Sequence, residues 1–268
     1  MNDKITVIGT GMMGSAVIKS LLKGGYQGKI TSVDIVAERL KEFEALGVKT
    51  STDNKTSAGD ADIVFIIVKP GDVEKVLKEI SKEITDKLLI SVAATVPLRF
   101  LKKNAPDAKI VRIMPNLGAL VQAAYTAYCC ESNVTAQDKE KVKTLLNMMG
   151  ICEEMDEKYM DAITAVSGSG PGYLSIIIEA MTYAGLKVGL PRDIALTCSA
   201  QTVVGAGKLV TDMHLDPSKI KDMTTTPGGT TIEAIYQIEQ SQIRASMIRA
   251  IEEATKKSQA IREKLNLN

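Results

Sequence analysis

Residues 4–14 read KITVIGTGMMG, and this stretch decides how the first half of the chain folds. A short β-favouring run stops at Gly9, and the apolar residues after the glycines recur with helical spacing as far as Leu22. The same alternation then continues. Further strands are expected at residues 29–33, 48–50, 62–68, 88–93, 110–114, 125–130 and 151–155, and further helices at 36–46, 73–80, after Pro97 and at 136–149. This pattern predicts an α/β fold with a doubly wound parallel sheet.

The alternation ends after Tyr159, and only helical patterns follow. Long helices are expected at residues 172–187, 193–212, 231–240 and 243–265, with breaks that contain glycine and proline between them. We therefore expect two domains. A Rossmann-like domain would span residues 1–157, and an all-helical domain would span residues 158–268.

The composition is that of an ordinary globular protein, with 45% apolar and 24% charged residues among 268 and a net charge of +1. This charge gives no electrostatic reason to expect nucleic acid or an anionic membrane as a partner. The four cysteines lack C-x-x-C spacing and His214 is the single histidine, so we expect no metal site and interpret the thiols as reduced, packed groups of a cytoplasmic protein. No apolar run reaches the roughly 18 residues that would predict a membrane span.

The three glycines of residues 9–14 follow the G-x-G-x-x-G pattern between a predicted strand and a predicted helix. Gly9 would permit the tight turn, Gly11 would let the backbone approach a pyrophosphate, and Gly14 would let the helix pack closely on the strand. The N–H groups at the start of the helix would bind the phosphates. Asp34, 20 positions after Gly14, completes the pattern of a dinucleotide site, so we expect NAD or NADP as cofactor.

Asp34 also bears on the choice between these two dinucleotides. A carboxylate at this position would accept hydrogen bonds from a ribose 2′-hydroxyl and repel a 2′-phosphate, which favours NAD. Asp34 could instead be a solvated cap of the helix near Val36, and Ser32 or Arg39 could serve a 2′-phosphate. We interpret Asp34 as leaning towards NAD and leave the choice open.

The carboxyl ends of the other parallel strands should face the same crevice. This selects residues 68–70 and 92–94, which follow two of the predicted strands. Lys69 could be an ordinary surface lysine, but its place directly after a buried strand favours the binding edge of the sheet. Asn54 could cap a short helix or contact the adenosine, and the cap is the simpler interpretation.

Two segments rich in glycine and hydroxyl groups precede helices in the second half, at residues 167–171 and 224–231. Both could offer helix N-termini to a carboxylate, or both could be flexible turns with capping residues. Groups suited to acid–base catalysis are scarce, and we interpret His214 as a surface or loop residue. Because an iminium carbon is already electrophilic, this scarcity favours a C=N substrate over a ketone.

Several strings in the chain together resemble the pyrroline-5-carboxylate reductase family, and the resemblance runs nearly end to end. These strings are VKP at 68–70, RIMPN at 112–116, AVSGSGP at 165–171, AGLKVGLPR at 184–192, AQTV at 200–203 and TPGGTTI at 226–232. Each is short, but their combination in this order is specific.

The resemblance implies an NAD(P)H-dependent oxidoreductase that acts on a C=N group and converts 1-pyrroline-5-carboxylate to L-proline, the last step of proline biosynthesis. It also implies that the helical domain forms a homodimer, which in the family can assemble into a larger ring. Thr231 would be the catalytic group, with its hydroxyl close to the imine nitrogen. The implied substrate-binding residues are Glu157, Thr226, Gly228, Gly229, Thr230 and Thr231. The implied cofactor-binding residues are Ile8, Gly9, Thr10, Gly11, Met12, Met13, Asn54, Ile67, Val68, Lys69, Pro70, Val92, Ala93 and Ala94.

The sequence departs from the family at residues 117–119 and 122–124, near the expected roof of the pocket, and Met223 replaces a frequent asparagine. Two alternative functions are a reductase of another small cyclic imine and a non-catalytic nicotinamide-binding sensor. A β-hydroxyacid reductase would need a lysine in the first helix of the second domain, and residues 172–184 contain none. A sensor would have no use for a second anion-binding turn.

Overall fold

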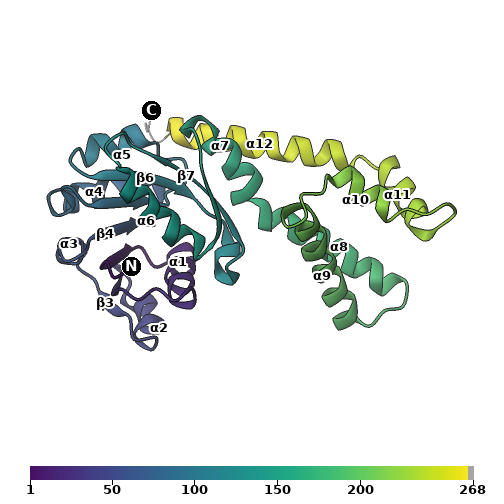
Figure 1. Ribbon diagram of the computed structural model, residues 1–268, viewed down its shortest axis with the longest axis horizontal. Helices are drawn as coiled ribbons and strands as arrows, with labels where there is room; N and C mark the ends of the chain where they lie inside the picture. Colours follow the sequence, from purple (N-terminus) through teal and green to yellow (C-terminus); the bar gives the residue numbers. More distant parts are fainter. Residues whose placement is uncertain (265–268) are drawn as a thin grey trace. The chain divides into compact units, whose positions relative to one another are not determined.

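The computed structural model describes residues 1–264, which form two compact units. The first unit comprises Met1–Ser169 together with the described residues from Glu253 onward, and the second comprises Gly170–Glu252. Figure 1 shows the sheet-containing unit and the helical unit, and each is described separately below.

The first unit is built on an eight-stranded sheet with the order β3-β2-β1-β4-β5-β6-β7-β8. The strands are β1 (Ile5–Ile8), β2 (Ile30–Val33), β3 (Lys49–Ser51), β4 (Ile63–Ile66), β5 (Leu88–Ser91), β6 (Lys109–Met114), β7 (Ala124–Cys130) and β8 (Gly150–Glu154). The first six are parallel to one another, which confirms the predicted doubly wound arrangement.

Strand β7 corrects the expectation of a wholly parallel sheet, because it runs antiparallel to β6, while β8 is parallel to β7. The connection between β6 and β7 spans only residues 115–123 and contains the short 3-10 helix η4 (Leu117–Val121). A parallel crossover needs about a dozen residues or more, so this connection can only reverse the chain.

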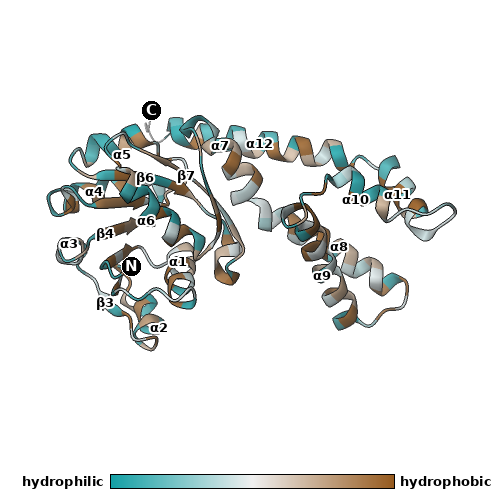
Figure 2. Ribbon diagram, in the orientation of Figure 1, coloured by the Kyte–Doolittle hydropathy of each residue, from teal (hydrophilic) through white to brown (hydrophobic). Residues whose placement is uncertain are grey.

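Helices cover both faces of the sheet. Helices α1 (Met12–Lys23) and α6 (Ala136–Asn147) pack on one face against residues such as Ile5 and Val7. Helices α3 (Asn54–Gly59), α4 (Val73–Ile80) and α5 (Leu98–Asn104) pack on the other, against Val64 and Ile66. Figure 2 shows the strands as predominantly hydrophobic, as expected for a sheet enclosed between two helical layers.

The single helix expected at residues 36–46 is replaced by the 3-10 helix η1 (Ala37–Leu40) and a short α2 (Lys41–Glu44). Two other short 3-10 helices, η2 (Pro70–Asp72) and η3 (Ser81–Ile84), flank α4. The chain leaves the sheet through η5 (Glu157–Tyr159) and α7 (Met160–Ile163). The buried carboxylate of Asp161 accepts hydrogen bonds from Ser258 Oγ at 2.7 Å and Arg262 Nη1 at 3.0 Å, which fixes the end of the last helix to the sheet-containing unit.

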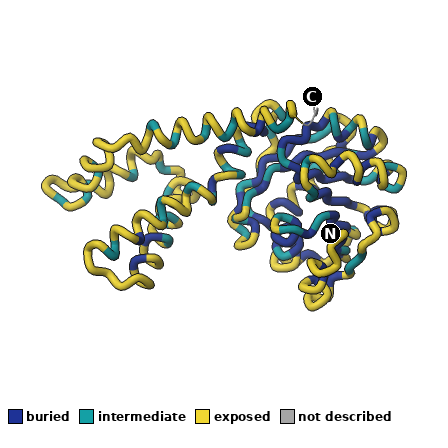
Figure 3. The backbone as a smooth tube through the Cα atoms, turned by 180° about the vertical axis from the view of Figure 1, so that it is seen from behind, coloured by how far each residue is buried: buried dark blue, intermediate teal, exposed yellow. Residues whose placement is uncertain are grey.

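The second unit is all-helical, as predicted. It contains α8 (Gly170–Lys187), α9 (Arg192–Thr211), α10 (Pro217–Met223), α11 (Thr230–Gln240) and the first part of α12 (Ile243–Lys264). Helix α10, which begins at Pro217 with Asp216 as its cap, was not predicted. The predicted end of the last helix at Leu265 lies outside the described residues. Figure 3 shows that most of this unit is exposed in the single chain. None of the helices in the described part of the chain combines the length and apolar character needed to cross a bilayer.

Candidate active site

The glycine turn lies between β1 and α1, as the sequence predicted. Gly9 has a φ of 93°, and its N–H donates to Val33 O at 2.8 Å. A Cβ at Gly9 would lie 2.5 Å from Ile67 O, and a Cβ at Gly14 would collide with Gly9 O. By contrast, a Cβ at Gly11 would meet no atom within 4 Å, and no side chain caps the helix that begins after it. The turn therefore offers open space and free N–H groups at the start of α1.

Asp34 holds this turn in place rather than facing solvent. Its side chain is 4% exposed. One carboxylate oxygen accepts from Thr10 N at 2.8 Å and from Arg39 Nη1 at 3.4 Å, and the other accepts from Val36 N at 2.9 Å. Burial alone would raise the pKa of Asp34, but the hydrogen bonds from Val36 and Thr10 and the charge of Arg39 hold that pKa below its usual range. The alternative interpretation of Asp34 as a solvated cap was therefore wrong, because the carboxylate is buried. The hydrogen bond from Val36 N that a cap would accept is nevertheless present.

A cavity of about 440 Å³ adjoins the glycine turn and is lined by Thr10, Gly11, Lys19, Arg39 and Glu42, among others. Glu42 accepts from Lys19 Nζ at 2.8 Å and from Ser15 Oγ at 3.1 Å. Arg39 also lines this cavity. Its side chain is 54% exposed, and it pairs with Asp34, the residue directly after β2.

The carboxyl ends of β4 and β5 lie beside the glycine turn. Ile67 N donates to Ile8 O at 2.8 Å, and Val92 N donates to Ile66 O at 2.9 Å, so three neighbouring strands end at one edge. Lys69 is exposed just beyond β4, where it precedes Pro70, the first residue of η2. The structure thus brings together the segments 8–14, 67–70 and 92–94, which were selected from sequence.

Asn54 is not the cap of its helix. The cap of α3 is Asp53, whose side chain accepts from Thr56 N at 3.1 Å. Asn54 is 7% exposed, and its Nδ2 donates to Glu79 Oε2 at 2.9 Å on α4. The capping interpretation of Asn54 was therefore wrong by one residue.

Glu157 lies where the sheet-containing unit continues into its last short helices. Its Oε1 accepts from Arg112 Nη1 at 2.8 Å and from Leu98 N, at the start of α5, at 2.6 Å. The Arg112 side chain is 4% exposed, whereas that of Glu157 is 32% exposed. Sequence reasoning missed Arg112 as a partner of Glu157, because 45 residues separate the two along the chain.

The expected separate turn at residues 167–171 is not present. Instead, these residues lie in a π-helical turn and in the start of α8. Residues Thr164–Gly168 form a π-helical turn that follows α7, and Ser169 N donates to Thr164 O at 2.9 Å. Asn116 Nδ2 donates to Ser167 Oγ at 3.0 Å, and a Cβ at Gly168 would press on the Met114 side chain. Single π-helical turns of this kind are frequent at functional sites.

In the second unit, residues Thr226–Gly229 form a tight turn directly before α11. Gly229 N donates to Thr226 O at 3.0 Å, and Gly228 has a φ of 66°, the geometry of a type II turn with Pro227 in its second position. No side chain caps α11, whose first residues are Thr230 and Thr231. The N–H groups of this helix start are therefore available to an anion.

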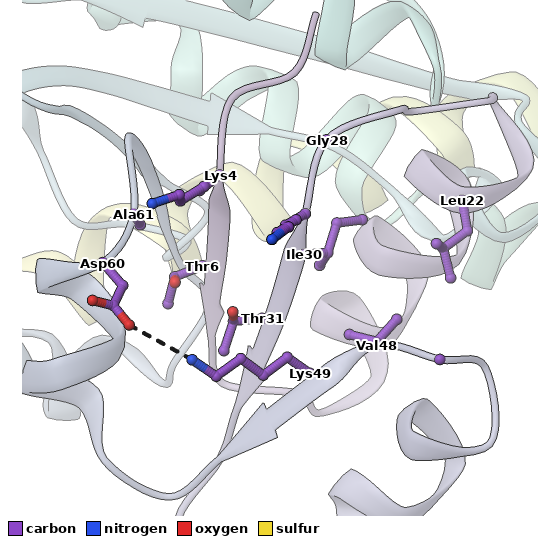
Figure 4. Close-up of a pocket in the computed structure, with 12 residues that line it drawn as sticks. Lys4, Thr6, Leu22, Gly28, Ile30, Thr31, Val48, Lys49, Asp60 and Ala61 are labelled. Carbon is purple, nitrogen blue, oxygen red and sulfur yellow. Dashed lines mark ion pairs between the residues drawn. The ribbon is translucent and has the colours of Figure 1, made fainter.

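A separate cavity of about 570 Å³ lies at the opposite, amino-terminal edge of β1, β2 and β3. Figure 4 shows its lining, which includes Lys4, Thr6 and the ion pair of Lys49 and Asp60, with 3.6 Å between Nζ and Oδ2. None of the residues predicted for the site lines it. Ligands of open α/β sheets bind at the carboxyl ends of the strands, so we assign this cavity no part in the site.

The four cysteines are free, and Cys129 is buried in the core. Burial raises the pKa of the Cys129 thiol to about 12 and that of Cys130 to about 11, so neither is a reactive thiolate near neutral pH. Cys198 and His214 are exposed. Within residues 1–264, no three His, Cys, Asp or Glu side chains are grouped so that they could hold a metal ion.

Comparison with known proteins gives matches to both parts of the chain. Residues 157–261 match the family described as pyrroline-5-carboxylate reductase dimerisation, and residues 4–95 match the family described as NADP oxidoreductase, coenzyme F420-dependent. Pyrroline-5-carboxylate reductase of Methanosarcina acetivorans is 37% identical over 98% of this chain and 99% of its own length. The Escherichia coli enzyme of the same name is 37% identical over 97% and 99%, respectively.

Solved structures agree with these relatives. The Plasmodium falciparum pyrroline carboxylate reductase with NADP bound superposes with a TM-score of 0.87 at 31% identity, covering 97% of this chain and 98% of that one. The Coxiella burnetii pyrroline-5-carboxylate reductase superposes with a TM-score of 0.89 at 30% identity over the same shares. Because this similarity extends along almost the whole chain, the chain belongs to the pyrroline-5-carboxylate reductase family.

Proposed function

We propose that this chain reduces 1-pyrroline-5-carboxylate to L-proline with NAD(P)H, the last step of proline biosynthesis. The observation that carries the proposal is the end-to-end similarity to curated reductases of that name, at 37% identity for two of them. The two sequence features that this reaction requires, a dinucleotide turn and a separate anion-binding turn, both lie at the starts of helices with no side-chain cap.

The glycine turn fits a dinucleotide, because Gly11 faces open space and the start of α1 presents free N–H groups. The bound dinucleotide would supply the hydride for the reduction. Residues 8–14 would hold its pyrophosphate, and Ile67 to Pro70 and Val92 to Ala94 would line its path along the strand ends. Asn54 would contact the adenosine while its side-chain amide donates a hydrogen bond to Glu79.

The preference between NADH and NADPH depends on the end of β2. Asp34 disfavours a 2′-phosphate by its charge, whereas the accessible guanidinium of Arg39 would attract one. Since both carboxylate oxygens of Asp34 already accept hydrogen bonds from backbone N–H groups, one from Thr10 and the other from Val36, its effect on the cofactor is one of charge more than of direct contact. We retain the proposal that Asp34 leans the enzyme towards NAD.

The substrate carboxylate would bind at the turn Thr226–Gly229 and the start of α11. Gly228 permits the turn, and the N–H groups that follow it favour a negative charge. Thr231, half-buried in the first turn of α11, would place its hydroxyl near the imine nitrogen, and Glu157 would contact the substrate through the oxygen that Arg112 and Leu98 do not engage. These groups orient a carbon that is already electrophilic, so no strong acid or base is needed.

The functional division that we propose places the dinucleotide-binding domain at residues 1–157 and the helical substrate-binding and dimerisation domain at 158–268. The dimerisation family matches residues 157–261, which supports a homo-oligomer. We propose a homodimer that can assemble further into a ring. The apolar helix α8 supports association between copies of the chain, because only Gly170 and Thr182 are buried among its 18 residues in the single chain. A cytoplasmic location is proposed on the four free thiols alone.

The test is the loss of NADH or NADPH absorbance in the presence of 1-pyrroline-5-carboxylate, with proline identified as the product. Turnover of the six-membered cyclic imine, but not of the five-membered one, would replace this substrate with a larger imine. Dinucleotide binding without turnover of any imine would support the sensor instead. The free start of α11 favours the reductase, because a sensor has no need for it.

A further inference from the structure

The chain turns sharply just after β5, at residues Ala93 to Val96. Val96 N donates to Ala93 O at 3.3 Å, which closes a four-residue turn. Thr95, in the third position, has a φ of 68°, whereas Ala94 is not among the residues with positive φ. One positive φ at this position defines a type II turn, whose third position favours glycine or asparagine.

A threonine is an unfavourable residue for this position. Its branched Cβ crowds the backbone in the left-handed region, so such a conformation is a genuine outlier. The turn before α11 has the same geometry, and there Gly228 occupies the equivalent position with a φ of 66°. Among the described non-glycine residues with positive φ, which are Asp86, Thr95, Gln122 and His214, only Thr95 is β-branched.

The hydroxyl of Thr95 carries a second penalty. Thr95 is 3% exposed, and its Oγ1 is buried without a hydrogen-bond partner among the residues that the structure describes. Buried hydroxyl groups are normally paired, and one left unpaired loses the hydrogen bonds that it made in water. Two local penalties at one residue point to a role that the folded chain alone does not satisfy.

The position of Thr95 indicates what that role is. Strands β1, β4 and β5 are neighbours in the sheet, and the strand order reverses between β1 and β4, where ligands of open α/β sheets bind. Thr95 follows β5, two strands from the glycine turn, which is about 10 Å at ordinary strand spacing. A dinucleotide with its pyrophosphate at the glycine turn would extend its nicotinamide half along this edge.

We propose that the Thr95 hydroxyl hydrogen-bonds the nicotinamide riboside half of the bound dinucleotide, and that the strained turn is retained because it holds the hydroxyl there. The proposal rests on the proposed cofactor site. A bound nicotinamide riboside offers the carboxamide and the ribose hydroxyls, any of which can pair with a threonine hydroxyl.

The test compares three variants by direct binding, in which NAD(P)H and ADP are each titrated against the intact protein. Thr95→Val keeps the branched shape and the backbone strain but removes the hydroxyl. Its Kd for NAD(P)H should rise about fivefold, the effect of one lost hydrogen bond, while its Kd for ADP, which lacks both the nicotinamide and its ribose, should stay unchanged. Thr95→Ser keeps the hydroxyl and should bind both ligands like the wild type.

Whereas Thr95→Val removes the hydroxyl alone, Thr95→Gly removes both the hydroxyl and the backbone strain. It should melt at or above the wild-type temperature, since relief of strain offsets the added freedom of the unfolded chain, and yet bind NAD(P)H as weakly as Thr95→Val. Wild-type NAD(P)H affinity in both Thr95→Val and Thr95→Gly would overturn the proposal. An equal loss of ADP affinity in Thr95→Val would also overturn it, because the effect would then not concern the nicotinamide riboside half. A wild-type protein that binds neither ligand would instead refute the cofactor site itself.

Discussion

At the scale of single residues, the sequence located the glycine turn correctly but could not show how its side chains are paired. Gly9, Gly11 and Gly14 could be predicted because their spacing reflects a local backbone requirement. The partners of Asp34 and Glu157 could not, because Thr10, Arg112 and Leu98 reach them through the fold. Thr95 gave no signal either, since only the observed φ reveals the strain.

Thr231→Ala should lower the turnover rate by about tenfold or more, the size of one lost transition-state hydrogen bond. The fold should persist, because Thr231 lies in the first turn of a helix with no buried residues. The measurement is steady-state kinetics with the imine as varied substrate. Thr231→Ser should restore most of the rate, and wild-type kinetics in Thr231→Ala would remove this hydroxyl from the site.

Asp34→Ser should shift the ratio of kcat/KM for NADPH to that for NADH by about tenfold towards NADPH. The reason is that one negative charge beside the 2′ position is removed and Arg39 is released from its ion pair. The ratio is the proper quantity, because losing the bonds to Thr10 and Val36 will also weaken the turn for both cofactors. Arg39→Ala should shift the ratio in the opposite direction. An unchanged ratio in Asp34→Ser would mean that Asp34 only organises the turn.

At the scale of elements, alternation and periodicity predicted the six parallel strands and the helices that cover them. The direction of β7 was missed, although the short connection at residues 115–123 contains the information. The π-helical turn at Thr164–Gly168 was also missed, because Ser-Gly-Ser-Gly-Pro has the composition of a loop. In the structure this turn packs against Met114 and accepts a hydrogen bond from Asn116. Local propensity thus failed where tertiary contacts override it.

The start of α6 provides a stability test with a defined pH dependence. Asp138 accepts from Thr135 N and Oγ1 and from Lys109 Nζ at 2.9 Å. Burial alone would raise the pKa of Asp138, but the bonds from Thr135 and Lys109 lower it below the usual 3.8. Because the folded state favours the charged form, the stabilisation is fully present above pH 3.8 and is lost as the pH falls through the lower, folded-state pKa.

Asp138→Asn should therefore reduce the free energy of unfolding by about 1 kcal/mol at pH 7, the scale of a lost capping interaction. Urea unfolding followed at several pH values measures the difference, which should shrink in acid. Glu38→Gln, at a carboxylate that is 75% exposed, should change stability little at any pH. A difference for Asp138→Asn that stays constant down to the acid transition would show that its charge does not contribute.

At the scale of the whole molecule, the helical unit leaves large apolar side chains exposed on several of its helices. Ile176 on α8, Val204 on α9 and Tyr236 on α11 are 63%, 49% and 58% exposed. Monomeric soluble proteins rarely leave such large apolar surfaces uncovered, and the dimerisation family matches this same region. Another copy of the chain is the partner that these two observations favour.

Ile176→Asp should therefore leave the sheet-containing unit intact but convert the oligomer into smaller species, because burying an unpaired carboxylate in an interface is costly. Light scattering coupled to size-exclusion chromatography gives the mass, and Tm should fall because association no longer stabilises the folded chain. Ile151→Asp, at an equally exposed apolar residue of β8, is the matched control and should keep the wild-type mass. If Ile176→Asp retains the full mass, α8 does not form the interface through this face. If the wild type itself is monomeric, the exposed surface of the helical unit must be covered by something other than a second copy.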